Sequence, residues 1–215
     1  MKKLIEKRVK AILFDLDGVL IDSFHFWFYL FNDTLKHFGH NRISLKTFRR
    51  HWGKSTQEDI ENFMPERKIK EIRSYFFSNM HKFTKYIKVN KEARPVLEIL
   101  KSKYKLGCVS NSHKKILRWQ IHKSGLKKYF QVIVSADDVE RPKPAPDMLL
   151  KALKKLKVQP DETIFVGDTK TDLIAGEKAG CIVVGYNIKS KLKTHSLRQI
   201  FVILRNFKKR SKNAF

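Results

Sequence analysis

Cysteine is scarce in this 215-residue chain, which contains only Cys108 and Cys181. Both lie inside apolar stretches, KLGCVS and GCIVVG, of the kind that form buried strands. A small fold held together by disulfides would need more cysteine pairs than this. We therefore expect both cysteines to be free thiols in the interior of the protein.

The chain also lacks long apolar runs and is poor in proline and glycine. No stretch approaches the roughly 20 apolar residues that a membrane-spanning helix needs, and charged residues interrupt the N-terminus where a signal peptide would be apolar. Six prolines and nine glycines do not suggest a disordered, low-complexity chain. With 42% apolar residues, we expect a soluble, cytoplasmic protein with a sizeable core.

Acidic residues are few relative to basic ones, with 21 Asp and Glu against 46 Lys and Arg, for a net charge of +25. This excess favours contact with nucleic acid, anionic lipid or phosphorylated metabolites. The basic residues are spread along the whole chain, however, which favours a lysine-rich solvated surface as the explanation of the charge. The charge alone does not decide the function.

Short apolar runs alternate with helical patterns over much of the chain. The predicted strands are Val9–Phe14, Lys105–Val109, Val132–Val134, Thr163–Val166 and Cys181–Val184. The predicted helices between and after them are Lys91–Ser102, Lys114–Lys123, Pro146–Lys157 and Thr171–Ala179. Strands that are apolar on both faces and alternate with helices predict an α/β fold with a mostly parallel sheet.

Residues 22–90 break this alternation. The segment contains helical patterns only, which are Asp22–Phe38, Arg42–Trp52, Thr56–Phe63 and Glu66–Tyr86. We expect an α-helical cap domain over residues 22–90, inserted into a core domain formed by residues 1–21 and 91–215. A basic amphipathic helix over Ser196–Lys209 is expected to dock on the sheet, with a surface anchor as the alternative.

Polar residues follow the predicted strands at the points where the strands end. Asp15 and Asp17 follow the first strand, and Ser110 and Asn111 follow the second. The loop after the third strand carries Lys143, and the fourth strand is followed by Asp168 and Asp172. Ligands bind at the carboxyl ends of strands in an open parallel sheet, so we expect these residues to share one crevice.

The chemistry available to this set is narrow. Its carboxylates would repel one another without a hard cation among them, and Mg²⁺ prefers oxygen ligands. Such an ion commonly serves phosphate chemistry. Ser110, Asn111 and Lys143 are suitable donors to phosphoryl oxygens, and a carboxylate can attack phosphorus as a nucleophile. The set predicts phosphoryl transfer.

The motifs DLDGV, VSN, RPKPAPD and GDTKTD, in this order, resemble the four motifs of the haloacid dehalogenase-like (HAD) phosphatases. The resemblance covers nearly the whole chain and is strongest to the phosphoglycolate phosphatase branch. It implies a Rossmann-like parallel-sheet core with an inserted α-helical cap. It also implies a Mg²⁺-dependent phosphatase that works through an aspartyl-phosphate intermediate.

The resemblance assigns roles position by position. Asp15 matches the nucleophile, and Asp17 matches the general acid and base. Ser110 and Lys143 match the phosphate-binding residues, with Asn111 beside them. The matching metal ligands are Asp168, Asp15 and the backbone carbonyl of Asp17, and Asp172 matches the acid that supports the metal site.

The predicted cap bears on the substrate. Lys54 lies in a segment that resembles the cap loop of this branch, and we expect it to meet an anionic group on the leaving portion of the substrate. In the similar β-phosphoglucomutases an arginine stands in place of Thr56 and a catalytic histidine in place of Trp27, which argues against mutase activity. The true dehalogenases lack the second acid that Asp17 supplies.

The expected substrate is a small phosphomonoester, a phosphoglycolate-like metabolite. A pyrophosphatase or a sugar-phosphate mutase of the same family is an alternative. A nucleic-acid-directed phosphatase or binder is another, because of the charge, although no basic stripe with interleaved aromatics supports it. We expect no membrane span, and either a monomer or a homodimer.

Overall fold

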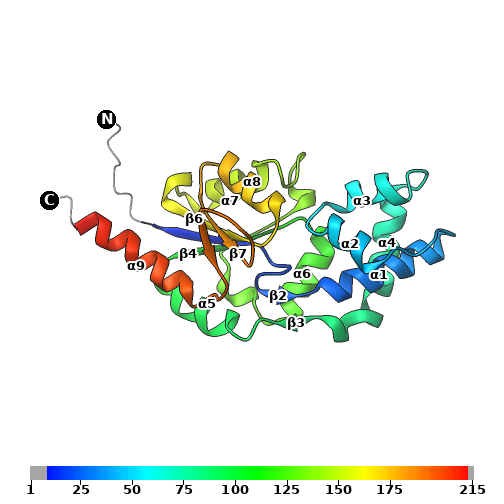
Figure 1. The fold of residues 1–215 in the computed structure, drawn as a ribbon, viewed down its shortest axis with the longest axis horizontal. Coiled ribbons are helices and arrows are strands. Elements are labelled where there is room, and N and C mark those ends of the chain that lie inside the picture. The colour runs from blue at the N-terminus through cyan, green and yellow to red at the C-terminus, as the bar shows by residue number, and fades with distance from the viewer. Residues whose placement is uncertain (1–8, 213–215) are drawn as a thin grey trace.

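A six-stranded parallel sheet forms the centre of the protein in a computed structural model that describes residues 9–212, with side chains described for residues 9–207 (Figure 1). The strand order is β5-β4-β1-β6-β7-β8, and every neighbouring pair is parallel. The strands are β1 (Ala11–Phe14), β4 (Lys105–Ser110), β5 (Val132–Ser135), β6 (Thr163–Gly167), β7 (Ile182–Tyr186) and β8 (Leu192–Thr194). The predicted α/β fold is confirmed.

Helices cover both faces of the sheet because each central strand is apolar on both sides. Ile12 and Phe14 of β1 pack in a cluster with residues of α5, α6 and α9, whereas Ala11 and Leu13 pack with α7 and α8. This division follows from the alternation of side chains along a strand. The helices are α5 (Ala93–Lys101), α6 (Lys114–Lys123), α7 (Asp147–Leu156), α8 (Lys170–Lys178) and α9 (Gln199–Lys212).

The C-terminal helix packs against the sheet, as expected. Leu197, Ile200 and Leu204 are buried in the same cluster as Ile12 and Phe14. Cys108 is buried and Cys181 is half-buried, and both thiols are free. Over residues 9–212, none of the helices combines the length and the apolar character that a membrane crossing requires.

Three very short strands of the structure carry no recognisable pattern in the sequence. One is β8, and the other two, β2 (Ile21–Asp22) and β3 (Lys88–Val89), pair antiparallel in a separate ribbon. Two or three residues are too few to show an alternating pattern. The sequence pattern also did not predict the three-residue 3-10 helices, which are η2 (Lys127–Tyr129), η3 (Ala136–Asp138) and η4 (Pro160–Glu162).

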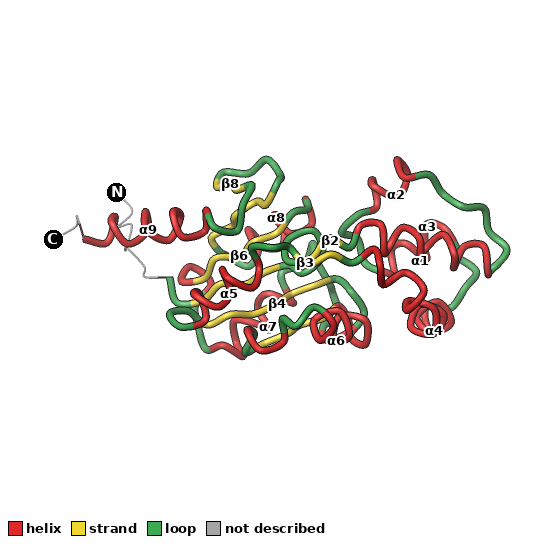
Figure 2. The backbone as a smooth tube through the Cα atoms, turned by 90° about the horizontal axis from the view of Figure 1, so that it is seen from below, coloured by secondary structure: helices red, strands yellow, loops and turns green. Residues whose placement is uncertain are grey.

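The segment between β2 and β3 forms a helical lobe, residues 24–86, at one end of the molecule (Figures 1 and 2). Its elements are α1 (Phe24–His37), α2 (Leu45–His51), α3 (Thr56–Phe63), α4 (Ile69–Asn79) and the 3-10 helix η1 (Met80–Tyr86). The lobe has its own apolar cluster, which includes Phe26, Phe48 and Phe76 and which Ile116 of α6 joins from the sheet side. The predicted domain boundaries stay a prediction.

Candidate active site

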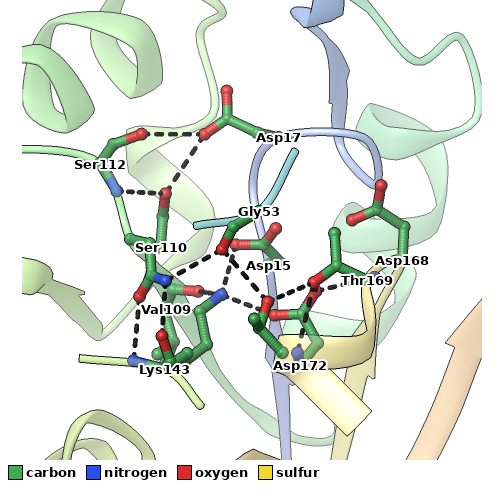
Figure 3. Close-up of polar contacts among 12 residues, drawn as sticks. Asp15, Asp17, Gly53, Val109, Ser110, Ser112, Lys143, Asp168, Thr169 and Asp172 are labelled. Carbon is green, nitrogen blue, oxygen red and sulfur yellow. Dashed lines mark hydrogen bonds and ion pairs between the residues drawn. The ribbon is translucent and has the colours of Figure 1, made fainter. Parts of the chain in front are cut away.

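The ends of the strands meet the helical lobe around one cavity of ≈ 70 Å³. Its walls include Asp15 and Asp17 after β1, Ser110 at the end of β4 and Lys143 from the loop before α7. Lys54 and several aromatic side chains line it from the lobe. Asp168 and Asp172, which follow β6, join the same cluster of polar residues (Figure 3).

Lys143 lies at the centre of this cluster and is only 2% exposed. Its Nζ donates to Asp15 Oδ1 at 2.9 Å, to Asp172 Oδ1 at 2.7 Å and to the carbonyl oxygen of Val109 at 3.0 Å (Figure 3). These bonds use all three donors of the ammonium group. Burial alone would lower the pKa of Lys143, but Asp15 and Asp172 outweigh it and raise the pKa. The lysine is therefore charged.

Three carboxylates surround this single lysine. Asp15, Asp168 and Asp172 each offer one oxygen, and these oxygens lie within 4.8 Å of one another. Burial raises the pKa of Asp168 to about 7, and the charge of Asp172 adds to the effect. Burial likewise raises the pKa of Asp15 well above its usual value, although Lys143 opposes the shift. With all three carboxyls ionised, the cluster would carry more negative charge than Lys143 can balance, and the raised pKa values reflect burial as well as this repulsion.

This donor set fits a Mg²⁺ ion. The ligands available are all oxygens, which Mg²⁺ prefers, and a divalent cation would balance the excess negative charge. Asp168 Oδ1 is buried and has no hydrogen-bond partner among the described residues, so it is free to bind an ion. The side chain of Asp17 is not part of this group of oxygens, which leaves its backbone carbonyl as the predicted ligand.

Gly18 allows the backbone after Asp17 to approach the Asp168 carboxylate. Its φ is +83°, in the left-handed region that glycine adopts readily. A Cβ at this position would lie 2.0 Å from Asp168 Oδ2. Any larger residue at position 18 would therefore displace the Asp168 carboxylate.

The carboxylate of Asp17 accepts hydrogen bonds from both parts of the molecule. From the lobe side, Ser23 Oγ and Trp27 Nε1 donate to Oδ1, the latter at 3.0 Å. From the sheet side, Ser110 Oγ at 3.2 Å and Ser112 Oγ at 3.0 Å donate to Oδ2, and Gln120 Nε2 donates to Oδ1. Of these donors, only Ser110 was singled out from the sequence as a site residue, and there for a role in phosphate binding.

Asn111 holds two loops in place. Its Nδ2 donates to the carbonyl oxygens of Lys143 at 2.9 Å and of Gly53 at 3.1 Å, and its Oδ1 accepts from the backbone N–H of Lys143 at 3.0 Å. The amide is thus already bonded to backbone at both of its ends. Its predicted contact with substrate phosphate stays a prediction, and its observed contacts position Lys143.

The loop between α2 and α3 is fastened to the sheet side of the site. Trp52 Nε1 donates to Asp168 Oδ2 at 3.2 Å, and Thr171 Oγ1 donates to the carbonyl oxygen of Gly53 at 3.1 Å. A Cβ on Gly53 would lie 2.6 Å from Thr169 Cγ2, so the loop approaches closely only because residue 53 is a glycine. The lobe and the sheet are in contact across the cavity.

Lys54, which was predicted to bind the substrate, lines the cavity and is half-buried. Its side chain makes no hydrogen bond or ion pair with the residues that the structure describes. His51 and Asp59 line the cavity beside it. Neither was predicted, because they come from two different helices and match no motif.

The sequence model of the haloacid dehalogenase-like hydrolases matches residues 12–186. Among proteins of assigned function, the chain is 31% identical to the pyrophosphatase PpaX of Bacillus velezensis, over 84% of this chain and 84% of the relative. The family model's match over residues 12–186 takes in all four motifs. It confirms the predicted hydrolase enzyme, and the phosphatases among the relatives support the predicted phosphatase class.

Solved structures share the same fold. A predicted phosphoglycolate phosphatase from Haemophilus somnus has a TM-score of 0.76 and 23% identity, covering 91% of this chain and 97% of that chain. A β-phosphoglucomutase from Clostridium difficile has a TM-score of 0.80 and 21% identity, covering 94% of this chain and 98% of that chain. At these identities the likeness establishes the fold alone.

Proposed function

The chain belongs to the haloacid dehalogenase-like hydrolase family, and on this premise we propose that it is a Mg²⁺-dependent phosphatase of a small phosphomonoester. The observation that carries the proposal is the position of Asp15 in the cavity. Lys143 donates to Asp15 Oδ1, and no described residue donates to Oδ2, which leaves that oxygen for attack on phosphorus. Asp17, which we assign as the proton donor, lines the same cavity.

The reaction proceeds in two steps. In the first, an Asp15 carboxylate oxygen bonds to phosphorus, the bond to the leaving oxygen breaks, and Asp17 gives that oxygen its proton. In the second, Asp17 takes a proton from water, the water oxygen bonds to phosphorus, and the bond to Asp15 breaks. Inorganic phosphate leaves and both aspartates return to their starting states.

The other residues bind and position. Lys143 and Ser110 are proposed to hold the phosphoryl oxygens once substrate displaces part of their present contacts. Mg²⁺ would be held by Asp15, Asp168 and the backbone carbonyl of Asp17, with Asp172 in support. When bound, the ion supplies positive charge to the transferring phosphoryl group.

The size of the cavity favours a small substrate. The cavity measures ≈ 70 Å³. Lys54 in its wall favours an anionic leaving group. Phosphoglycolate is small and carries such a group, which supports it over the bulkier nucleotides and nucleic-acid ends as the substrate class. Pyrophosphate is also small and anionic and is the second candidate, in keeping with the name of the PpaX relatives.

We further propose that residues 22–90 act as a cap over a core of residues 1–21 and 91–215. The contacts of Trp52 and Gly53 with the sheet side support this division. Closure over the substrate would exclude water from the reacting phosphorus. A cytoplasmic location and a monomer or homodimer remain part of the proposal.

A phosphate-release panel tests the proposed function. It compares phosphoglycolate, pyrophosphate, sugar phosphates, nucleotides and a 5′-phosphorylated oligonucleotide, each with Mg²⁺ and with EDTA. We expect phosphoglycolate or pyrophosphate to give the highest kcat/KM and EDTA to abolish release. Highest activity on the oligonucleotide, or release that persists in EDTA, would overturn the proposal. Retention on a heparin column provides a separate check of nucleic-acid binding.

A further inference from the structure

Two polar side chains in the lobe wall of the cavity have no role in the proposed reaction. His51 is the last residue of α2 and Asp59 lies on α3, and each side chain is only 18% exposed. His51 Nδ1 and Asp59 Oδ1 lie 3.6 Å apart, within ion-pair distance but beyond hydrogen-bond distance, and neither atom has a hydrogen-bond partner among the described residues. Buried polar atoms are normally hydrogen-bonded, and both side chains line the cavity, which points to a ligand.

Both side chains are held on rigid supports. The edge of the His51 ring packs against Phe63, with 4.7 Å between the ring centroids. Helix α3 begins with a capping box in which Ser55 and Glu58 bond to each other's backbone, which uses the Glu58 carboxylate. The ring contact positions His51, and the capping box fixes the start of the helix that carries Asp59.

The charges around the pair favour an anion. Burial raises the pKa of Asp59 to about 7; Glu58 adds to the shift and Lys54 opposes it. Burial also lowers the pKa of His51, with a further contribution from Lys54. Near neutral pH the imidazole is therefore uncharged, the Asp59 carboxyl carries a proton on a large fraction of molecules, and Lys54 supplies a positive charge.

We propose that His51 and Asp59 form, together with Lys54, a subsite for the anionic end of the leaving group. The imidazole N–H and the carboxyl O–H donate to the anion, and the ammonium group pairs with its charge. The anion is either a carboxylate or a second phosphoryl group, which share acceptor oxygens and negative charge. This inference rests on the proposed phosphatase function and names the residues that select its substrate.

The test compares three substrates that differ at the leaving group. Phosphoglycolate and pyrophosphate carry the anion, and 2-hydroxyethyl phosphate is the neutral analogue of phosphoglycolate. We expect His51→Phe and Asp59→Leu to lower kcat/KM for one or both anionic substrates by about 10-fold or more. The neutral ester should change by no more than about 3-fold, which also shows that the variant is folded.

Conservative variants separate hydrogen bonding from packing. His51→Gln and Asp59→Asn keep an N–H donor and should retain most of the wild-type preference for the anion. Gln57→Ala is the matched control, because Gln57 lies on α3 but is exposed and outside the cavity. A fall on phosphoglycolate alone assigns the subsite to carboxylates, and a fall on pyrophosphate alone assigns it to phosphoryl groups.

Equal falls on the charged and neutral substrates, or no fall on either, would overturn the subsite. Failure of the proposed function looks different, because the wild type would then release phosphate from none of the three. Calorimetric titration with 3-phosphonopropionate and 3-hydroxypropylphosphonate, which are not hydrolysed, tests the subsite in that case too. The subsite is supported if the wild type binds 3-phosphonopropionate more tightly than 3-hydroxypropylphosphonate and if His51→Phe abolishes this difference. Equal binding of the two compounds by the wild type contradicts it.

Discussion

Replacing Lys143 by methionine removes the one positive charge that the described residues place inside the carboxylate cluster. The side chain is similar in length, but the three bonds of Nζ to Asp15, Asp172 and Val109 are lost. Asp15 and Asp172 then remain buried without their counter-charge. Breaking a buried ion pair by removing one partner costs about 3–5 kcal/mol.

For a chain of this length, such a loss lowers the melting temperature by roughly 6–20 °C, at about 2–4 °C per kcal/mol. The difference from wild type should shrink with Mg²⁺, which supplies the missing charge. It should also shrink as the pH falls, because protonated carboxyls no longer repel one another. Both trends follow from charge and not from packing.

Urea unfolding at neutral pH with EDTA measures the loss, and repetition with Mg²⁺ measures its recovery. Lys155→Met is the matched control, because Lys155 is exposed on α7 and should change stability by less than about 0.5 kcal/mol. A loss below about 1 kcal/mol for Lys143→Met would refute the reasoning, since it would mean that the carboxylates do not need the lysine.

Three further changes test the surroundings of the site. Lys54→Ala should lower kcat/KM for phosphoglycolate by roughly 10- to 150-fold and leave 2-hydroxyethyl phosphate nearly unchanged; an equal effect on both would make Lys54 structural. Trp52→Phe removes the N–H that orients Asp168 and should weaken Mg²⁺ binding in calorimetry about 10-fold or more, with Trp119→Phe unchanged. Asp59→Asn should have about the same free energy of unfolding as the wild type at pH 4 and a higher one at pH 8, by on the order of 2–4 kcal/mol. Equal values for the two proteins at pH 8 would contradict the burial of the Asp59 carboxyl.

The sign of the Asp59 effect follows from proton linkage. Burial raises the pKa of Asp59 from 3.8 to about 7, so the folded protein holds this proton more tightly than the unfolded chain does. The stabilisation is complete below about pH 4 and is lost as the pH rises through 7. Asparagine does not ionise, so the variant does not lose this stability as the pH rises.

The core of the fold was predictable because its strands carry a strong signal. All four residues of Ala11–Phe14 are buried, and such strands read as continuous apolar runs. The rule that ligands bind where parallel strands end then brings Asp15, Ser110 and Asp168 together without any knowledge of distances. Local sequence pattern and the topology of a parallel sheet were therefore enough to predict the sheet and the polar residues at its strand ends.

The lobe side of the site was not predictable in the same way. Trp27 and Gln120 reach Asp17 from α1 and α6, and their meeting depends on how the lobe packs against the sheet. His51 and Asp59 belong to helices separated by a four-residue break, so no helical spacing relates them. Asn111 shows the same limit, since the strand-end rule places it at the site but does not reveal that its amide is bonded to the backbone of Lys143.

The most direct test of the central claim is to identify the residue that carries the phosphoryl group. Borohydride reduces an aspartyl phosphate to homoserine, and peptide mass spectrometry locates the change. Wild-type protein quenched during turnover of its best substrate with Mg²⁺ should show homoserine at position 15, and Asp15→Asn should show none. Homoserine at Asp17 or Asp168, or its absence during rapid turnover, would contradict the assignment of Asp15 as the nucleophile.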